Sequence, residues 1–118
     1  MWEIELTTTW EKDEKHYAKK HPRELAAIFR NLQRYRVLLR QSPNSKAVQA
    51  GYLHREPGGV IAVDQKGGGA NLQETRAYTY ADDEKKILYL ITLGNKSSQR
   101  ADIELSKVFV RDTFPRQA

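Results

Sequence analysis

The stretch from residue 74 to residue 93 most constrains what this chain can fold into. Successive side chains of a strand point to opposite faces of a sheet. One face of the first half carries the charged and aromatic side chains Glu74, Arg76, Tyr78 and Tyr80. The second half, residues 87–93, is apolar at nearly every position, which is typical of a strand covered on both faces. Polar residues 82–86 separate the halves, so we expect a hairpin whose second strand lies in the middle of a sheet.

The N-terminal third predicts one strand and two helices. Residues 2–6 alternate apolar and acidic side chains, as a half-buried strand does. Thr8 as N-cap with Glu11 three residues later matches a capping box, so a surface helix is expected from Thr9 to Lys20. Pro22 suits the first turn of a second helix that runs to Gln41. The apolar stripe of this helix consists of Leu25, Ile28, Phe29, Leu32, Tyr35 and Leu39.

The remaining residues predict a small sheet and a final helix. A short extended piece is expected at residues 52–54 and a strand at residues 60–64, with a turn between them. Gly67–Gly69 lacks the ending of a phosphate loop and is interpreted as a flexible connection. The final helix is expected to end at Pro115, before a loose tail. Its apolar side consists of Ile103, Val108 and Phe109.

The order of these elements, β-α-α-β-β-β-α, predicts an α+β fold. We expect a single domain over residues 1–118, with the two N-terminal helices packed on one face of a small, mostly antiparallel sheet.

Composition excludes several classes of protein. The chain has no cysteine, which removes disulfide frameworks, thiolate nucleophiles and cysteine-bearing zinc sites. His16, His21 and His54 have no matching carboxylate cluster at ligand spacing, so neither a metal nor another cofactor is expected. The polar, acidic N-terminus is unlike a signal peptide, and no apolar run approaches membrane length. A cytoplasmic protein without a membrane partner is the expectation.

The charge balance points to an anionic partner. The formal net charge is +5, and most of the surplus lies on the second predicted helix. Its cations are Arg23, Arg30, Arg34, Arg36 and Arg40. This face can meet the phosphates of RNA or an acidic protein. The alternative is a solvated, solubilising surface.

Two segments resemble the bacterial toxins of the RelE/ParE superfamily, most closely the HigB-like branch. Residues 74–80 are similar to the family's arginine- and tyrosine-bearing strand, and residues 93–99 to its turn of lysine, serine and glutamine. The order of elements also matches. The resemblance implies the toxin of a type II toxin–antitoxin system, which cleaves ribosome-bound mRNA without a metal. It also implies a cognate antitoxin as partner, and either a homodimer or a heterotetramer with that antitoxin.

The cleavage chemistry needs a base, an acid and cations around the scissile phosphate. Arg76 and Lys96 suit the phosphate, while Tyr78 suits base stacking or proton donation. The family's nucleases commonly place a tyrosine or histidine near the C-terminus, where residues 110–114 have neither. His54 is therefore the candidate acid or base. The candidate RNA-binding residues are Arg30, Arg34, Tyr80, Asn95 and Gln99.

Each of these residues also has a structural alternative. Arg76 can pair with Glu74 or Asp102, the tyrosines can be sheet residues, and Lys96 can be a solvated turn lysine. Two other functions also fit the residues. One is a ParE-type toxin that binds a protein target such as gyrase, and the other is a relative that binds RNA or antitoxin without catalysis.

Overall fold

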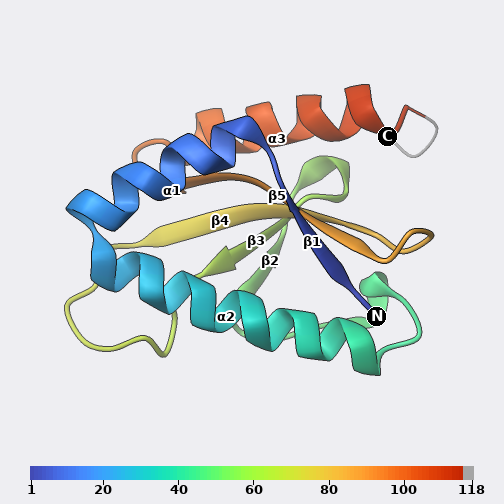
Figure 1. Ribbon diagram of the computed structural model, residues 1–118, viewed down its shortest axis with the longest axis horizontal. Helices are drawn as coiled ribbons and strands as arrows, with labels where there is room; N and C mark the ends of the chain where they lie inside the picture. The colour runs from blue at the N-terminus through green and yellow to red at the C-terminus, as the bar shows by residue number, and fades with distance from the viewer. Residues whose placement is uncertain (116–118) are drawn as a thin grey trace.

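A computed structural model describes residues 1–115. Figure 1 shows the helices and strands in chain order. The strands are β1 (Glu3–Leu6), β2 (Leu53–Arg55), β3 (Ile61–Asp64), β4 (Thr75–Asp82) and β5 (Ile87–Asn95). The α-helices are α1 (Thr8–Lys20), α2 (Pro22–Gln41) and α3 (Gln99–Thr113), and the 3₁₀-helices are η1 (Ser45–Ala47) and η2 (Pro57–Gly59). The predicted loose tail falls on residues 116–118, which lie outside the described residues.

The strands form one mixed sheet in the order β1-β5-β4-β3-β2. The pairs β2–β3, β3–β4 and β4–β5 are antiparallel, whereas β1 runs parallel to β5. The α+β class is confirmed, and β5 lies in the interior of the sheet as expected, although β4 is the central strand. The expected order has one strand too few, because residues 53–55 pair with β3 as a strand of their own.

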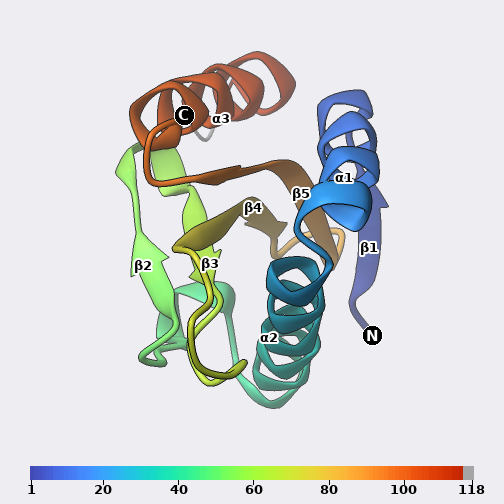
Figure 2. The same ribbon diagram turned by 90° about the vertical axis from the view of Figure 1, so that its left-hand side faces the viewer.

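Helices cover both faces of this sheet. One face packs on α1 and α2 through Trp10, Ile28, Tyr35, Ala77 and Leu90, as expected for the N-terminal helices. Val110 of α3 packs on the opposite face, against Tyr78 and Ile91. Figure 2 shows α3 above β4 and α2 below it. Because both faces are covered, every interior position of β5 can be apolar.

A register shift in the sheet explains why Leu90 and Leu93 of β5 pack on the same face, although strict alternation along a strand would place them on opposite faces. Leu90 is registered with Thr79, and Thr92 with Tyr78, so Ile91 between them has no partner in the register. Because of this bulge Leu93 packs toward α1 and α2 as Leu90 does, while Ile91 packs toward α3.

Thr7, not Thr8, caps α1, so the predicted capping box is wrong. The Thr7 hydroxyl accepts a hydrogen bond from the Trp10 amide at 3.0 Å and donates to the Ile91 carbonyl at 2.6 Å. The cap therefore also ties α1 to β5, a long-range contact that the local spacing of Thr8 and Glu11 cannot show.

The apolar stripes are correct except at single positions. Phe29 of α2 is 39% exposed rather than buried with the rest of its stripe. In α3 the fully buried residues are Ser106 and Val110, whereas Ile103 and Phe109 are only partly buried. Within residues 1–115 no helix is both long and apolar enough to cross a membrane.

Candidate functional site

A histidine–carboxylate pair lies across the β2–β3 hairpin. His54 Nε2 is 2.6 Å from Asp64 Oδ2. The hairpin registers His54 opposite Ala62, so Asp64 is its diagonal neighbour on the same face. The His54 side chain is 28% exposed and the Asp64 side chain only 5%. One ring nitrogen of His54 is therefore held by a buried carboxylate, while the ring itself reaches solvent.

The backbone and carboxylate of Asp64 are fixed from several sides. Its Oδ1 accepts a hydrogen bond from the Lys66 amide at 2.8 Å. Its main-chain carbonyl accepts from Nδ2 of Asn31, a buried residue of α2, at 2.8 Å. The Lys66 ammonium lies 3.9 Å from Oδ2 and is largely exposed. Asp64 can therefore orient His54 without itself moving.

Arg76 of β4 lies beside this pair. Its register partner across β3–β4 is Asp64, so the two side chains share the face that α3 covers in part. The Arg76 guanidinium lies 3.5 Å from Glu56 and 3.6 Å from Glu74, and its Nε is buried with no hydrogen-bond partner among residues 1–115. Of the two pairings proposed from sequence, the one with Glu74 forms. Any phosphate that binds Arg76 has to compete with both carboxylates.

Tyr78 and Tyr80 lie under α3. Tyr78 is fully buried, and burial together with the nearby Asp102 carboxylate raises the pKa of its hydroxyl. Tyr80 is 9% exposed and stacks on Phe114 with ring centroids 4.8 Å apart. In this arrangement the Tyr78 hydroxyl does not reach a substrate.

The turn between β5 and α3 is held by its own side chains. Asn95 Oδ1 accepts hydrogen bonds from the Ser97 amide, the Ser97 hydroxyl and the Ser98 amide at 2.7–3.1 Å. Asn95 thus shapes the turn, and this oxygen is not open to RNA. Lys96 is exposed and Gln99 begins α3. Register with β4 places this turn at the end of the sheet that carries Arg76.

The first turn of α3 packs closely on β5. The Ser98 hydroxyl donates to Asp102 Oδ2 at 2.7 Å, and these two side chains lie directly over Gly94. Burial raises the pKa of the Asp102 carboxyl; the hydrogen bond from Ser98 opposes this shift and the charge of Asp13 adds to it.

The arginines of α2 hold the glycine-rich connection against the helix. Arg23 donates to the Ala70 carbonyl and Arg30 to the Gly67 carbonyl, each at 3.0 Å. Arg34 donates to Asn31 Oδ1 at 3.3 Å and lies over the Tyr52 ring. Hydrogen bonds at Gly67 and Ala70 therefore link this predicted flexible connection to α2.

These acceptors are all neutral oxygens, and within residues 1–115 none of the three arginines forms an ion pair, although the Glu24 carboxylate is near Arg23. Arg23, Arg30 and Arg34, with Lys66, form a basic surface along α2 and the adjoining loop. We call it the α2 basic surface. It meets the His54–Asp64 pair at Lys66, because Asn31 bonds both the Asp64 and the Lys66 carbonyl.

The structure thus brings together His54 and Arg76, and places Lys96 at the same end of the sheet. Sequence reasoning missed Asp64, Glu56 and Lys66. Asp64 could have been identified from the sequence. The predicted turn at residues 56–59 folds the strand that ends in Asp64 back alongside His54.

Among residues 1–115 no three His, Cys, Asp or Glu side chains lie close enough to hold a metal ion. The chain matches no model of a known protein family, and no curated protein is significantly similar to it.

Proposed function

We propose that this chain is the toxin of a type II toxin–antitoxin pair and cleaves mRNA on the ribosome without a metal. The observation that carries the proposal is the partly exposed His54 held by the buried Asp64, with Arg76 registered opposite Asp64. A positioned imidazole beside cations is what RNA cleavage by the neighbouring 2′-hydroxyl needs. The segments at residues 74–80 and 93–99, which resemble RelE- and HigB-type toxins, support the same proposal.

In the proposed reaction His54 removes the proton from a ribose 2′-hydroxyl. The 2′-oxygen attacks the adjacent phosphorus, the bond to the 5′-oxygen breaks, and a 2′,3′-cyclic phosphate forms. The leaving 5′-oxygen takes a proton from water and departs as a hydroxyl group. Asp64 holds the ring in one orientation and stabilises the imidazolium that arises. Two lysines supply further positive charge at this end of the sheet. The Lys66 ammonium lies 3.9 Å from Asp64, and Lys96 forms no ion pair within residues 1–115. They balance charge on the phosphorane, and Arg76 joins them when phosphate displaces Glu56 or Glu74.

The α2 basic surface binds RNA phosphates on either side of the scissile bond in this proposal. Its guanidinium groups are exposed, form no ion pair within the described part of the chain and adjoin Lys66. Such a surface binds RNA through salt-dependent phosphate contacts. A cognate antitoxin with an acidic segment would cover the same charges in the cytoplasm.

Induced expression in bacteria tests the proposal. We expect wild type to arrest growth and to produce new 5′ ends in bulk mRNA, detected by primer extension. His54→Gln should abolish both, because general acid–base catalysis contributes about a hundredfold or more to the rate. His16→Gln is the matched control, since His16 is an exposed histidine of α1. Cleavage that persists in His54→Gln would contradict the assigned base.

A second candidate is a ParE-type toxin that binds an acidic protein target. The pairing of Arg76 with Glu56 and Glu74 favours it, since a compensated guanidinium is a poor phosphate ligand. Growth arrest without new mRNA ends would select this candidate. Arrest should then survive His54→Gln and be lost in Arg30→Glu, Arg34→Glu.

A further inference from the structure

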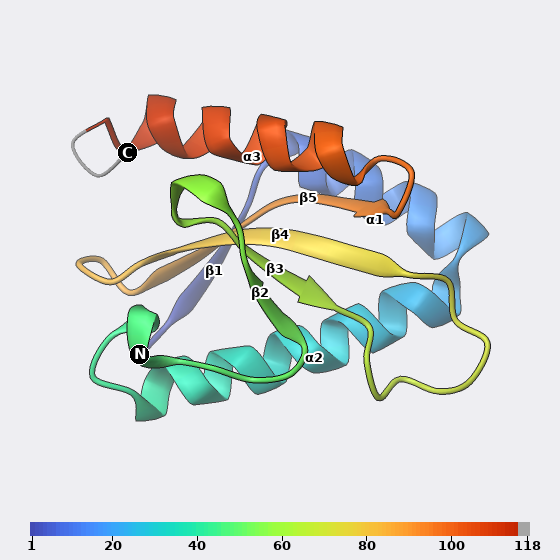
Figure 3. The same ribbon diagram turned by 180° about the vertical axis from the view of Figure 1, so that it is seen from behind.

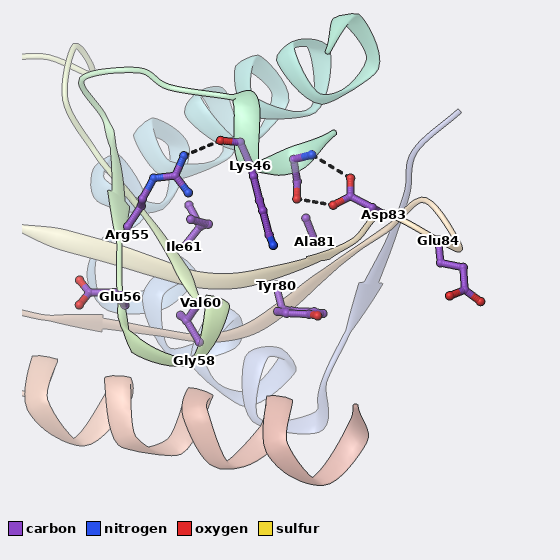
Figure 4. Close-up of a pocket in the computed structure, with 12 residues that line it drawn as sticks. Lys46, Arg55, Glu56, Gly58, Val60, Ile61, Tyr80, Ala81, Asp83 and Glu84 are labelled. Carbon is purple, nitrogen blue, oxygen red and sulfur yellow. Dashed lines mark hydrogen bonds between the residues drawn. The ribbon is translucent and has the colours of Figure 1, made fainter. Parts of the chain in front are cut away.

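A cleft of about 800 Å³ lies away from the His54–Asp64 pair, between η1, the β2–β3 hairpin and the β4–β5 turn (Figure 4). The side chains that matter here are Lys46, Arg55, Val60, Ile61, Ala81 and Asp83. Neither His54 nor Asp64 lines the cleft. Its size is that of a ligand-binding site rather than of a packing defect.

The cleft exists because β4 is longer than β3. Pairing between them ends at Ile61 and Thr79, whereas β4 continues alongside β5 as far as Asp82. The chain before β3 turns away into η2, where Gly58 and Gly59 have φ of 79° and 82°, a region that glycine adopts readily. Figure 3 shows this connection reaching toward α3. As a result, no β3 residue in the described register faces Ala81.

Hydrogen bonds hold the walls of the cleft in place. Asp83 of the β4–β5 turn accepts from the Ser45 amide at 2.8 Å and from the Ser45 hydroxyl at 2.6 Å. On the other wall Arg55 donates to the Lys46 carbonyl at 2.7 Å. The cleft is therefore preformed, and a ligand would not have to order η1 on binding.

Charge is distributed unevenly in the cleft. Lys46 and Arg55 form no ion pair with a carboxylate of residues 1–115, and Figure 4 shows the Lys46 side chain reaching into the cleft. Three carboxylates also line the cleft: Glu56, which pairs with Arg76, and Asp83 and Glu84 on the wall opposite the two cations. A suitable ligand therefore places a negative group beside the two cations and none along the other wall.

We propose that this cleft binds an extended peptide segment of a partner protein, with an acidic side chain next to apolar ones. A peptide can offer main-chain N–H and C=O groups to the edge of β4 at Ala81, as in strand addition. Its carboxylate meets Lys46 and Arg55, and its apolar side chains meet the partly exposed Ile61 and Ala81. Single-stranded RNA fits less well, since it carries a phosphate at every nucleotide and would pass Asp83 and Glu84. The inference is independent of RNA cleavage.

Fluorescence anisotropy with the full chain tests this inference. The probe is a fluorescein-labelled, acetylated peptide of about eight residues that alternates glutamate with valine, the strand pattern expected of the partner. We expect saturable binding that Lys46→Glu, Arg55→Glu weakens at least about tenfold, because two attractive charges become repulsive. The same peptide with lysine in place of glutamate should not bind measurably.

Lys12→Glu, Lys15→Glu is the matched control, because it reverses two exposed cations of α1, a helix that contributes no residue to the lining of the cleft. It should leave the peptide affinity within about twofold. Thermal melts of both variants check that the fold is retained, and slowed amide exchange at Ala81 on peptide binding locates the site.

An equal loss of peptide affinity in both double variants would overturn the inference, and so would tight binding of the lysine peptide. If oligouridylate binds wild type and the control but not the Lys46→Glu, Arg55→Glu variant, the cleft would instead be an RNA-binding site. If wild type and the control self-associate but the Lys46→Glu, Arg55→Glu variant does not, the cleft would bind a second copy of this chain.

Discussion

Replacing Gly94 by alanine should destabilise this protein by about 3 kcal/mol. Gly94 lies where the first turn of α3 packs on β5, and a methyl group built there would overlap the Asp102 carboxylate and the Ser98 hydroxyl. Relieving the overlap displaces both side chains. That breaks the Ser98–Asp102 hydrogen bond of 2.7 Å and the 3.1 Å bond from the Asn95 amide to the Ser98 hydroxyl. Each such bond contributes about 1 kcal/mol, and overpacking a close contact adds about 1–3 kcal/mol.

Urea unfolding followed by circular dichroism measures this free energy, with Gly51→Ala as the matched control. Gly51 is exposed, has no positive φ, and a methyl group there meets no atom within 4 Å. The control should change the free energy of unfolding by less than about 0.5 kcal/mol. Asp102→Ala in the Gly94→Ala background removes the main obstacle, so the two changes together should cost less than their sum. A Gly94→Ala protein as stable as wild type would refute the close packing of α3 on β5.

Three further predictions concern the polar groups around the sheet. Asp64→Asn should lower kcat of RNA cleavage about tenfold or more with KM nearly unchanged, because Asp64 orients His54 and does not bind substrate; a change confined to KM would speak against that role. Tyr78→Phe should raise the free energy of unfolding by about 1 kcal/mol in urea titrations, since its buried hydroxyl has no hydrogen-bond partner among residues 1–115. It should also leave mRNA cleavage intact, and loss of cleavage would restore Tyr78 as a catalytic residue. Because the pKa of the Asp102 carboxyl is raised, the folded state binds a proton at Asp102 more tightly than the unfolded state does. The stabilisation that comes from this protonation is present at low pH and is lost as the pH rises above the ordinary carboxyl range. The Asp102→Asn variant cannot lose this stabilisation. In urea titrations its free energy of unfolding relative to wild type should therefore increase between pH 4 and pH 7, and a difference that stays constant with pH would contradict the raised pKa of Asp102.

Local periodicity was enough to predict the α+β class and most of the helices. The apolar stripe of α2 indicates one buried face, and the all-apolar run of β5 indicates two. Each pattern lies within the element itself, so it can be recognised without knowing the rest of the fold. Both predictions agree with the structure. The errors lie where a distant residue decides. Thr7 rather than Thr8 caps α1 because its hydroxyl also bonds Ile91. Phe29 is 39% exposed although Leu25 and Ile28 of the same stripe are buried, because it lies at the side of the stripe rather than on its centre line.

The candidate site was predictable in its residue types but less so in its pairings. His54, Arg76 and Lys96 were chosen by chemistry, and the sheet places Arg76 beside the His54–Asp64 pair. The partner of His54 depends on the register of a hairpin, and the partners of Arg76 depend on where η2 carries Glu56. The arginines of α2 show the same limit, since their bonds to residues 67–70 follow from a loop path that no periodic pattern encodes.

The parallel pairing of β1 with β5 has a consequence for how the chain acquires its structure. Residues 3–6 pair with residues 87–90, so β1 has no neighbour until β5, the last of the five strands in chain order, has been made. Until then α1 lacks the strand on which it packs, whereas α2 can already contact β3 and β4. Contacts this distant in sequence slow folding, because the intervening chain must be ordered before they form. β1 therefore joins the sheet late, and its segment with α1 stays exposed to aggregation for most of synthesis.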